Sequence, residues 1–436
     1  MNTTYGIRLE DKNEWERRTP LVPEDVRDLA ENHGLTCQVQ ASPLRVFEEN
    51  EYIQNKAQIL DDLSGCPVVF GVKEFPFDFL RHGKTYVFFS HTIKGQAYNM
   101  PLLKKIMEQG CTLIDYERMI DQNGARVTSF SRFAGIAGMI DSLWALGQRL
   151  ETEGLRSPFG QIKRALEYSS LQEAKDAVIH AGEVIKQRGL PSNVSPLVCG
   201  FAGYGKVSGG AQEIYDLLPV EEVGAADLET FIQDGNFSHR AVYKTVFKEV
   251  DMVRPRSSEA AFELNDYYRH PEKYESQFSR YLPHLTMLIN GVYWDQPYPH
   301  LVEKKALHHL FAQEGMPRLR VIGDVSCDIE GAVECTVRST DPGNPVYVYD
   351  PEEGSTADGV SGRGVVIMAV DNLPCELPRE SSSAFSNDLK DLVPEIVKAD
   401  YSVEFARLAL SDAIKKAVIV HQGKLTPDYR YLEQSL

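Results

Sequence analysis

The sequence has few cysteines, and they form no metal or redox motif. Seven cysteines are scattered over 436 residues with no C-x-x-C pair, which argues against a disulfide framework or a zinc site and favours buried free thiols in a reducing compartment. Long apolar runs are also missing, since none approaches the ~18–20 residues of a membrane span. The N-terminal stretch MNTTYGIRLEDKNEWERR lacks the apolar centre of a signal peptide. We therefore expect a cytoplasmic protein without membrane contacts.

Basic residues are fewer than acidic ones. The 46 lysines and arginines face 63 aspartates and glutamates, a formal net charge of −17. This balance argues against broad nucleic-acid or anionic-membrane surfaces, although a local Arg or Lys can still dominate a small anion site. Hydrophobic residues at 42% and charged residues at 25% exclude a disordered chain, a collagen and a coiled coil. At about 150 residues per domain, the length predicts two or three domains.

The first third of the sequence alternates short apolar runs with helical stretches. We predict strands at 5–8, 68–72, 86–90 and 111–116, and helices at 24–33 and 101–109. Such alternation predicts an α/β fold, in which a mostly parallel sheet carries helices on its faces.

Later segments continue the pattern. Apolar side chains that recur every three or four residues predict a helix over 134–148, and a domain junction is expected at or after it. We also predict helices at 171–187, 386–399 and 403–420, and strands at 195–201, 286–289, 319–322 and 365–370. Segment 250–280 is charged and aromatic, and we expect it to be an excursion on the surface of the second domain.

The clearest strand-to-helix turn follows the strand at 195–201. Gly200, Gly203 and Gly205 stand between this apolar strand and an amphipathic helix. Glycine permits positive φ in a tight turn and lets a phosphate approach the backbone N–H groups at the helix N-terminus. From Gly203 the spacing is G-x-G-x-x-S, with Ser208 in place of the usual third glycine. We expect a dinucleotide site here; the alternative is a purely structural turn.

The next strand bears on the choice between NAD and NADP. We expect it to end near Val223, after Glu221 and Glu222. An acidic residue at its tip would favour NAD, but the tip is Gly224, and no Arg or Lys follows at once to bind a 2′-phosphate. These residues leave the choice open and lean slightly away from NAD.

Polar side chains follow several strands in the first third. Lys73, His91 and Glu117 each come just after an apolar run, and Arg18 and Arg126 lie nearby. Ligands of open α/β sheets collect at the carboxyl ends of strands. A lysine beside other cations has a lowered pKa, histidine titrates near neutral pH, and arginine grips carboxylates. The alternatives are a solvated lysine, a structural histidine and a simple Glu117–Arg126 ion pair.

A later turn carries two carboxylates. Asp324 and Asp328 lie in VIGDVSCDIEGAVECT, directly after a predicted strand. They either cap this turn or reach the nicotinamide end of a cofactor.

Taken together, these motifs resemble the lysine-2-oxoglutarate reductases, the saccharopine-forming half of the bifunctional α-aminoadipic semialdehyde synthases. The resemblance extends to the fungal saccharopine dehydrogenases and, more distantly, to the alanine dehydrogenases. The similar stretches are WERRTPLVP, FGVKEFP, YVFFSHTIKGQAYNM, LIDYERMIDQNGARV, AGIAGMI, GYGKVSGGAQEIY, LINGVYWDQ, DVSCDIEGAVECT and DNLPCELPRE.

The resemblance implies two Rossmann-like, doubly wound α/β domains with a cleft between them. The dinucleotide-binding domain, residues 141–339, is inserted into the substrate domain, residues 1–140 and 340–436.

The resemblance also implies a reaction: reversible reductive condensation of L-lysine with 2-oxoglutarate to saccharopine, using a reduced nicotinamide. Lys73 and His91 match the family's acid–base pair, and Glu117 matches a glutamate near it. Arg18 and Arg126 match arginines expected on substrate carboxylates. Asp328 matches an aspartate expected near the substrate amine or the nicotinamide.

The implied cofactor contacts are Gly200, Gly203, Tyr204, Gly205, Lys206, Val207, Asn290, Tyr293 and Asp328. NADP(H) is favoured because GYGKVSGGA looks like the NADPH-using reductases; NAD(H) is the alternative. We expect no metal ion, small-molecule substrates, and neither a nucleic-acid nor a membrane partner; the sequence leaves the oligomeric state open. Two other interpretations stay open: an opine- or alanine-type dehydrogenase for another amine and oxo acid, and a catalytically silent nucleotide-binding sensor.

Overall fold

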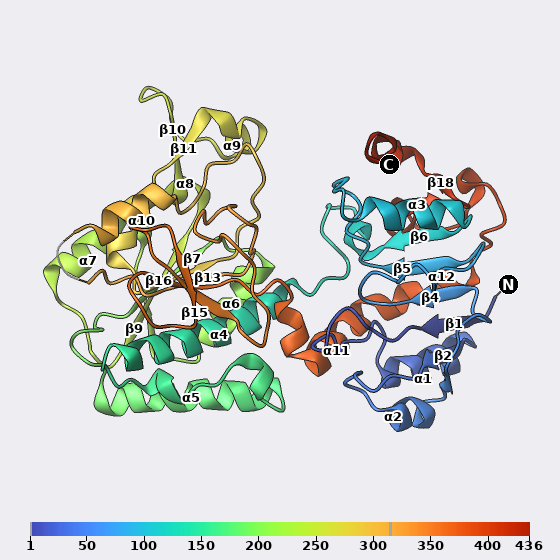
Figure 1. The fold of residues 1–436 in the computed structure, drawn as a ribbon, viewed down its shortest axis with the longest axis horizontal. Coiled ribbons are helices and arrows are strands. Elements are labelled where there is room, and N and C mark those ends of the chain that lie inside the picture. The colour runs from blue at the N-terminus through green and yellow to red at the C-terminus, as the bar shows by residue number, and fades with distance from the viewer. Residues whose placement is uncertain (1, 314–315) are drawn as a thin grey trace. The chain divides into compact units, whose positions relative to one another are not determined.

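The computed structural model describes residues 2–313 and 316–436 (Figure 1). The chain divides into two units. Unit 1 contains the chain up to Phe130 together with Pro378–Leu436, and unit 2 contains Ser131–Leu377. The expected boundaries, 140/141 and 339/340, therefore differ from those of the structure. Residues 131–140 belong to one continuous helix of unit 2, and strands within 346–368 pair with the sheet of unit 2.

An eight-stranded sheet forms the centre of unit 1, in the order β3-β2-β1-β4-β5-β6-β17-β18. The first six strands are parallel to one another, and β17 and β18 are antiparallel. The strands are β1 (Thr4–Ile7), β2 (Thr36–Gln40), β3 (Gln58–Leu60), β4 (Val68–Phe70), β5 (Thr85–Phe88), β6 (Thr112–Asp115), β17 (Val418–His421) and β18 (Lys424–Leu425). The order of the parallel strands is the usual one of a doubly wound sheet.

Both segments of unit 1 contribute to its core. Every residue of β4, β5 and β6 is buried, as parallel strands covered on both faces require. Val87 and Ile114 from the first segment share one apolar cluster with Phe385 and Ile396 from the second. The helices of unit 1 are α1 (Pro23–His33), α2 (Glu49–Gln54), α3 (Met100–Glu108), α11 (Pro378–Leu389), α12 (Val393–Lys398) and α13 (Asp412–Ala417).

The predicted helix over 403–420 is wrong. Only Asp412–Ala417 is α-helical, and Val418–His421 forms β17 beside β6. All four residues of β17 are buried, and its run of valine and isoleucine fits a strand better than a helix.

Unit 2 has its own eight-stranded sheet, in the order β15-β14-β16-β13-β12-β7-β9-β8. The strands from β16 to β8 are parallel, and β14 and β15 add an antiparallel edge. The strands are β7 (Val198–Ala202), β8 (Val220–Glu222), β9 (Val242–Phe247), β12 (Met287–Asn290), β13 (Val321–Asp324), β14 (Val346–Tyr349), β15 (Thr356–Asp358) and β16 (Val365–Met368).

The sheet of unit 2 departs from the usual doubly wound order at one side. β9, not β8, pairs with β7, and β8 lies beyond β9. The strand that ends near Val223 is present as predicted, but it is not a neighbour of the strand before the glycine turn. The helices of unit 2 are α4 (Ser131–Thr152), α5 (Leu171–Arg188), α6 (Lys206–Tyr215), α7 (Leu228–Asp234), α8 (Glu249–Met252), α9 (Leu264–Arg269) and α10 (Lys304–Phe311).

Residues after β9 form the expected excursion from the sheet of unit 2. There α8 and α9 accompany a two-stranded antiparallel sheet of β10 (Val253–Pro255) and β11 (Tyr274–Ser276). Tyr267 and Tyr274 belong to the apolar core of unit 2, so the excursion is anchored to the unit. None of the helices within residues 2–313 and 316–436 is long and apolar enough to span a membrane.

Candidate active site

The carboxyl ends of the parallel strands of unit 1 carry a cluster of charged side chains. Glu10 follows β1, Lys73 and Glu74 follow β4, His91 follows β5, and Asp115 ends β6. Since these strands are parallel neighbours, their carboxyl ends lie at one edge of the sheet. The predicted residues Lys73 and His91 thus follow adjacent strands.

Glu10 joins the end of β1 to the loop that carries Lys73. Its carboxyl oxygens accept hydrogen bonds from the backbone N–H groups of Val72, at 2.6 Å, and Lys73, at 3.0 Å. Burial raises the pKa of Glu10 to about 7, and the negative charge of Glu16 adds to this shift. A buried carboxyl group from β1 therefore fixes the backbone at Lys73.

The amine of Lys73 is a weaker base than an ordinary lysine. Burial lowers its pKa, and the positive charge of Arg18 lowers it further, against the opposite effects of Glu16 and Glu74. Within the described ranges, this amine has no hydrogen-bond acceptor on the protein. A partly buried amine with a lowered pKa gives up its proton to a bound molecule more readily than an ordinary lysine does.

His91 is held in place by both its backbone and its ring. Its φ of 51° lies in the left-handed region, uncommon for a residue other than glycine, and its carbonyl accepts a hydrogen bond from the Asn99 amide at 2.7 Å. The ring Nδ1 lies 2.6 Å from Oε1 of Glu74, whose other oxygen bonds Lys12 at 3.0 Å. Burial alone would raise the pKa of Glu74, but His91 and Lys12 lower it to about 2. Glu74 therefore presents a carboxylate to His91 over the whole physiological range.

Arg18 lies inside the protein and pairs with Glu16. Its Nε donates to Oε1 at 2.8 Å and its Nη2 to Oε2 at 2.6 Å, and both side chains are almost fully buried. The guanidinium also stacks 4.2 Å from the centre of the Phe130 ring. Such a bidentate pair fixes the direction of the guanidinium. The predicted role of Arg18 on a substrate carboxylate stays a prediction.

The end of β6 connects Ser90, beside His91, with Glu117 and Arg126. Asp115 is fully buried and accepts hydrogen bonds from the Ser90 hydroxyl and from the Glu117 backbone N–H, the latter at 2.8 Å. Burial raises the pKa of Asp115 to about 6. Glu117 and Arg126 form an ion pair at 2.6 Å, which was one of the alternatives for these residues.

Sequence reasoning missed the acidic members of the cluster. Glu16 and Glu74 lie within the WERR and GVKE motifs that drew attention to Arg18 and Lys73, so each was one or two residues from a predicted site. Their pairing with Arg18 and His91 is tertiary and gives no local pattern. Glu10 carried no signal, because its partners lie 62 and 63 residues along the chain.

In unit 2 the glycine turn lies between β7 and α6, as predicted. Gly203 has a φ of 85°, and a Cβ there would come within 3.0 Å of a Val292 methyl group. Gly205 is the N-cap of α6. Gly200 is different, because it lies inside β7 and not in the turn. A Cβ on Gly200 would meet the Phe247 and Leu285 side chains within 3.0 Å, so its missing side chain serves packing.

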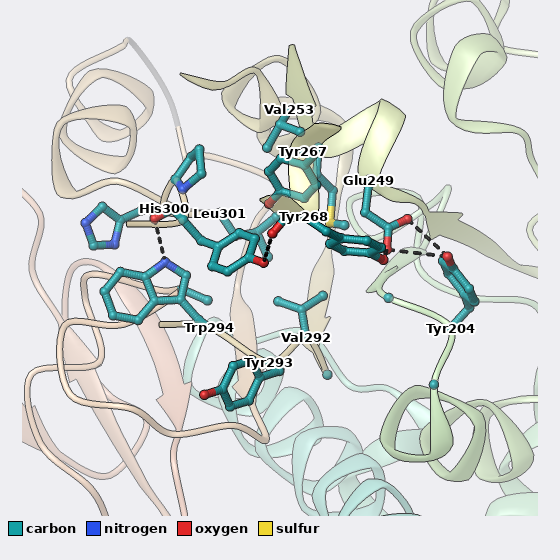
Figure 2. Close-up of a pocket in the computed structure, with 17 residues that line it drawn as sticks. Tyr204, Glu249, Val253, Tyr267, Tyr268, Val292, Tyr293, Trp294, His300 and Leu301 are labelled. Atoms are coloured by element: carbon teal, nitrogen blue, oxygen red, sulfur yellow. Dashed lines mark hydrogen bonds between the residues drawn. The ribbon is translucent and has the colours of Figure 1, made fainter. Parts of the chain in front are cut away.

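A cavity of about 440 Å³ opens beside the glycine turn, within the 300–1,000 Å³ range usual for small-molecule sites. Figure 2 shows the tyrosine and tryptophan side chains of its wall. The lining residues are Gly203, Tyr204, Gly205, Glu249, Met252, Val253, Tyr267, Tyr268, Gly291, Val292, Tyr293, Trp294, Tyr298, Pro299, His300, Leu301 and Ala332. The predicted residues Gly203, Tyr204, Gly205 and Tyr293 are thus brought together.

The carboxylate of Glu249 lies in this wall. The Tyr268 hydroxyl donates to Glu249 at 2.6 Å, and the Tyr204 hydroxyl lies 3.2 Å from the same carboxylate. Burial, followed by this hydrogen bond and the Glu249 charge, raises the pKa of Tyr268, so the phenol stays protonated and donates. Sequence reasoning missed Glu249 and Tyr268, since both lie at or in the excursion that was expected only to cover the surface.

The other predicted cofactor residues lie outside the lining of the cavity. Lys206 and Val207 begin α6. Asn290 is buried, and its amide donates to Asp324 at 2.8 Å. Asp324 also accepts from Thr336, and burial raises its pKa to about 6. Asp324 thus holds the turn after β13 together, whereas Asp328 is exposed.

Both domain models of one protein family match this chain. The model "Alanine dehydrogenase/PNT, N-terminal domain" matches residues 6–137, and "Alanine dehydrogenase/PNT, C-terminal domain" matches residues 245–428.

Curated relatives align over nearly the whole chain. The mitochondrial alpha-aminoadipic semialdehyde synthase of Bos taurus is 36% identical over 98% of this chain, and the synthase of Arabidopsis thaliana is 37% identical over 99%. These alignments cover 47% and 41% of the two synthases, so the chain spans less than half of their length. Saccharopine dehydrogenase (NAD(+), L-lysine-forming) of Yarrowia lipolytica is 23% identical, over 90% of this chain and 92% of that protein.

Solved structures support the fold assignment. An L-alanine dehydrogenase superposes with a TM-score of 0.63 at 20% identity, over 99% of this chain and 98% of its own. A transhydrogenase from Sinorhizobium meliloti gives 0.58 at 15% identity, over 97% and 100%. These two structures share the fold of the chain. The two domain models show that the chain belongs to the alanine dehydrogenase/PNT family, and the synthase alignments agree with this assignment.

Proposed function

We propose that the protein is an oxidoreductase that reductively condenses L-lysine with 2-oxoglutarate to saccharopine, reversibly, with a nicotinamide cofactor. One observation carries the proposal: a weakly basic Lys73 amine and a Glu74-oriented His91 follow neighbouring strands of one sheet. The names of the relatives, α-aminoadipic semialdehyde synthase and saccharopine dehydrogenase, support the choice of substrates.

The residues around the glycine turn fit a pyridine dinucleotide. The positive φ of Gly203 and the 440 Å³ cavity leave room beside the first turn of α6, where backbone N–H groups and the helix dipole favour a pyrophosphate. Gly203, Gly205, Lys206 and Val207 would hold the pyrophosphate. When bound, the nicotinamide supplies or accepts the hydride.

The acid–base steps fall to the cluster in unit 1. As the lysine ε-amine adds to the 2-oxo carbon, His91 moves protons so that the carbinolamine loses water and an imine forms. Once the imine has been reduced to the secondary amine of saccharopine, Lys73 would exchange a proton with that amine, which its lowered pKa favours. Arg126 would bind a substrate carboxylate, and Arg18, fixed by Glu16, would add positive potential. Such proton transfers typically contribute ~10²–10⁴-fold in rate.

The decisive assay follows the absorbance of the reduced nicotinamide with L-lysine and 2-oxoglutarate. We expect cofactor oxidation that requires both substrates. Ornithine or alanine in place of lysine, and pyruvate in place of 2-oxoglutarate, serve as comparisons. Faster oxidation with another pair would replace the proposed substrates, and cofactor binding without turnover on any pair would contradict an enzymatic role.

Two substitutions test the acid–base pair. Lys73→Met and His91→Gln should each lower turnover by roughly 10²-fold or more while cofactor binding persists. The matched controls are Lys104→Met and His82→Gln, which change exposed residues of unit 1 outside the cluster. Wild-type turnover in both site variants would rule out the assigned roles.

A further inference from the structure

The strand order of unit 2 changes which residue can reach a bound ribose. In the usual dinucleotide fold, an acidic residue about 20 positions after the glycine motif ends the strand beside the glycine turn and bonds the ribose hydroxyls. Here that spacing leads to Glu222 at the end of β8. β8 is separated from β7 by β9, and Glu222 pairs with Lys244 at 2.9 Å.

β9 takes the place beside the glycine turn. Ala202 at the end of β7 pairs with Phe247 at the end of β9, and the Gly203 N–H donates to the Phe247 carbonyl at 3.1 Å. The residues that follow β9 are Lys248 and Glu249. By position in the sheet, Glu249 therefore corresponds to the ribose-binding acid that the sequence spacing had led us to seek near Gly224.

The side chain of Glu249 supports this assignment independently of the topology. It lines the cavity beside Gly203 and Gly205, whereas Lys248 is exposed and does not line it. Figure 2 shows the hydroxyls of Tyr204 and Tyr268 meeting at its carboxylate. A carboxylate has about four acceptor positions, so two phenols fix its direction and leave capacity for a diol.

We propose that this cavity binds the adenosine half of NAD(H), and that Glu249 selects NAD(H) over NADP(H) by accepting hydrogen bonds from the 2′- and 3′-hydroxyls of the ribose. This inference rests on the proposed use of a nicotinamide cofactor and specifies that the cofactor is NAD(H). It goes against the NADP(H) preference expected from the resemblance of the glycine turn.

The charges of the cavity exclude a 2′-phosphate. Glu249 is the one carboxylate among the described lining residues, and these include no lysine or arginine. A phosphate there would lie against a negative charge without a lysine or arginine partner, whereas NADP sites usually provide an arginine. The apolar side chains of Met252, Val253 and Leu301 complete the wall and suit a flat adenine ring.

The test compares the binding of NADH and NADPH to the full chain by fluorescence titration. The wild-type protein should bind NADH at least about tenfold more tightly, as expected when one charged hydrogen bond of 1.5–3 kcal/mol separates the two ligands. Equal affinities, or tighter binding of NADPH, would overturn the inference and leave the proposed function standing. Failure of both dinucleotides to bind would overturn both.

Variants assign the preference to Glu249. Glu249→Arg should reverse the NADH/NADPH ratio, and Glu249→Gln should reduce it. The control Glu259→Gln, at an exposed position of the same excursion, should leave the ratio unchanged. If Glu249→Arg fails to fold, Tyr268→Phe takes its place. This substitution removes one phenol hydroxyl from Glu249 without adding charge, and it should lower the NADH/NADPH affinity ratio too.

A ligand without nicotinamide isolates the subsite. ADP-ribose should displace NADH from the wild-type protein better than 2′-phospho-ADP-ribose does. On Glu249→Arg, ADP-ribose should displace NADH no better than 2′-phospho-ADP-ribose does. Stronger displacement by the phosphorylated ligand, lost in Lys248→Ala, would show that Lys248 reads a 2′-phosphate and would contradict the role of Glu249.

Discussion

At the scale of single residues, Glu74 does more for His91 than its position beside Lys73 suggests. Oε1 of the Glu74 carboxylate lies 2.6 Å from Nδ1 of the His91 ring, and Oε2 accepts a hydrogen bond from the Lys12 amine at 3.0 Å. A neutral imidazole that gives its Nδ1 proton to a carboxylate keeps Nε2 as the acceptor. Glu74 thereby selects which ring nitrogen is available for proton transfer.

The substitution Glu74→Gln tests this arrangement. The amide keeps the size of the side chain but removes the charge, so the ring loses part of its orientation. We expect turnover to fall about 10- to 100-fold, less than for loss of an acid–base group itself, with a smaller change in KM. Steady-state kinetics over a range of pH measures both, and Glu49→Gln, at an exposed position of α2, is the control. Unchanged kinetics in Glu74→Gln would show that the pair is structural.

Residues of the unit 1 cluster and of the unit 2 cavity differ in how well the sequence predicts them. Lys73 and His91 stand directly after apolar runs, and the carboxyl ends of such strands are where ligands collect, so position alone singles them out. Glu10 and Glu249 become informative only through partners on other strands. No pattern within a few residues records such contacts, and this is why both were missed.

At the scale of elements, the sequence pattern predicted nine of the eighteen strands in the described residues, but not their order. The buried runs of β4, β5 and β6 are recognisable as apolar segments between turns. β17 was taken for part of a helix, since a four-residue apolar run next to a helical pattern does not show by itself which structure it adopts. Neither β9 nor its pairing with β7 was predicted from the sequence. The ribose-binding acid was therefore sought at the end of β8, near Gly224, and Glu249 was missed.

A buried pair of carboxyl groups connects α4 to the chain just before Pro378. Asp141 and Glu376 are both buried, and Oδ2 of Asp141 and both Glu376 oxygens lack a hydrogen-bond donor among the described residues. Protonation of one carboxyl group makes it a hydrogen-bond donor to the other, and the two side chains act as such a pair. Burial raises the pKa of both groups, that of Asp141 to about 6. The negative charge of Asp141 raises the pKa of Glu376 further, whereas Glu376 lowers the pKa of Asp141 as its hydrogen-bond partner.

This pair makes stability depend on pH. In the unfolded chain both groups lose their protons near pH 4, but in the folded chain they keep a proton to about pH 6 and above. The folded state binds more protons in this range, so stability falls as pH rises from about 4 through 6. We expect Asp141→Asn, whose amide donates to Glu376, to be more stable relative to wild type at pH 8 than at pH 5. Urea unfolding at both values measures this, with exposed Asp234→Asn as control; the same difference at both pH values would contradict the protonated pair.

At the scale of the whole molecule, the two units differ in how the chain builds them. Unit 1 needs both ends of the sequence: the Phe130 and Phe385 rings stack at 4.4 Å, and β17 from the C-terminal segment pairs with β6. Unit 2 is one continuous segment with its own sheet and core. The glycine turn, the cavity and Glu249 all lie inside this segment.

We therefore expect residues 131–377 to fold alone and residues 1–130 to fail. The first fragment keeps all eight strands of its sheet, whereas the second lacks β17, β18, α11 and α12 and would expose apolar side chains that α11 and α12 cover in the whole protein. Cooperative thermal unfolding, measured by circular dichroism, separates the two outcomes. NADH at 100 times its Kd should stabilise both fragment 131–377 and the intact chain by about 2.7 kcal/mol. At the same NADH concentration, the fragment carrying Glu249→Arg should lose this effect. A fragment 131–377 that unfolds without cooperativity would mean that unit 2 depends on unit 1 for its stability.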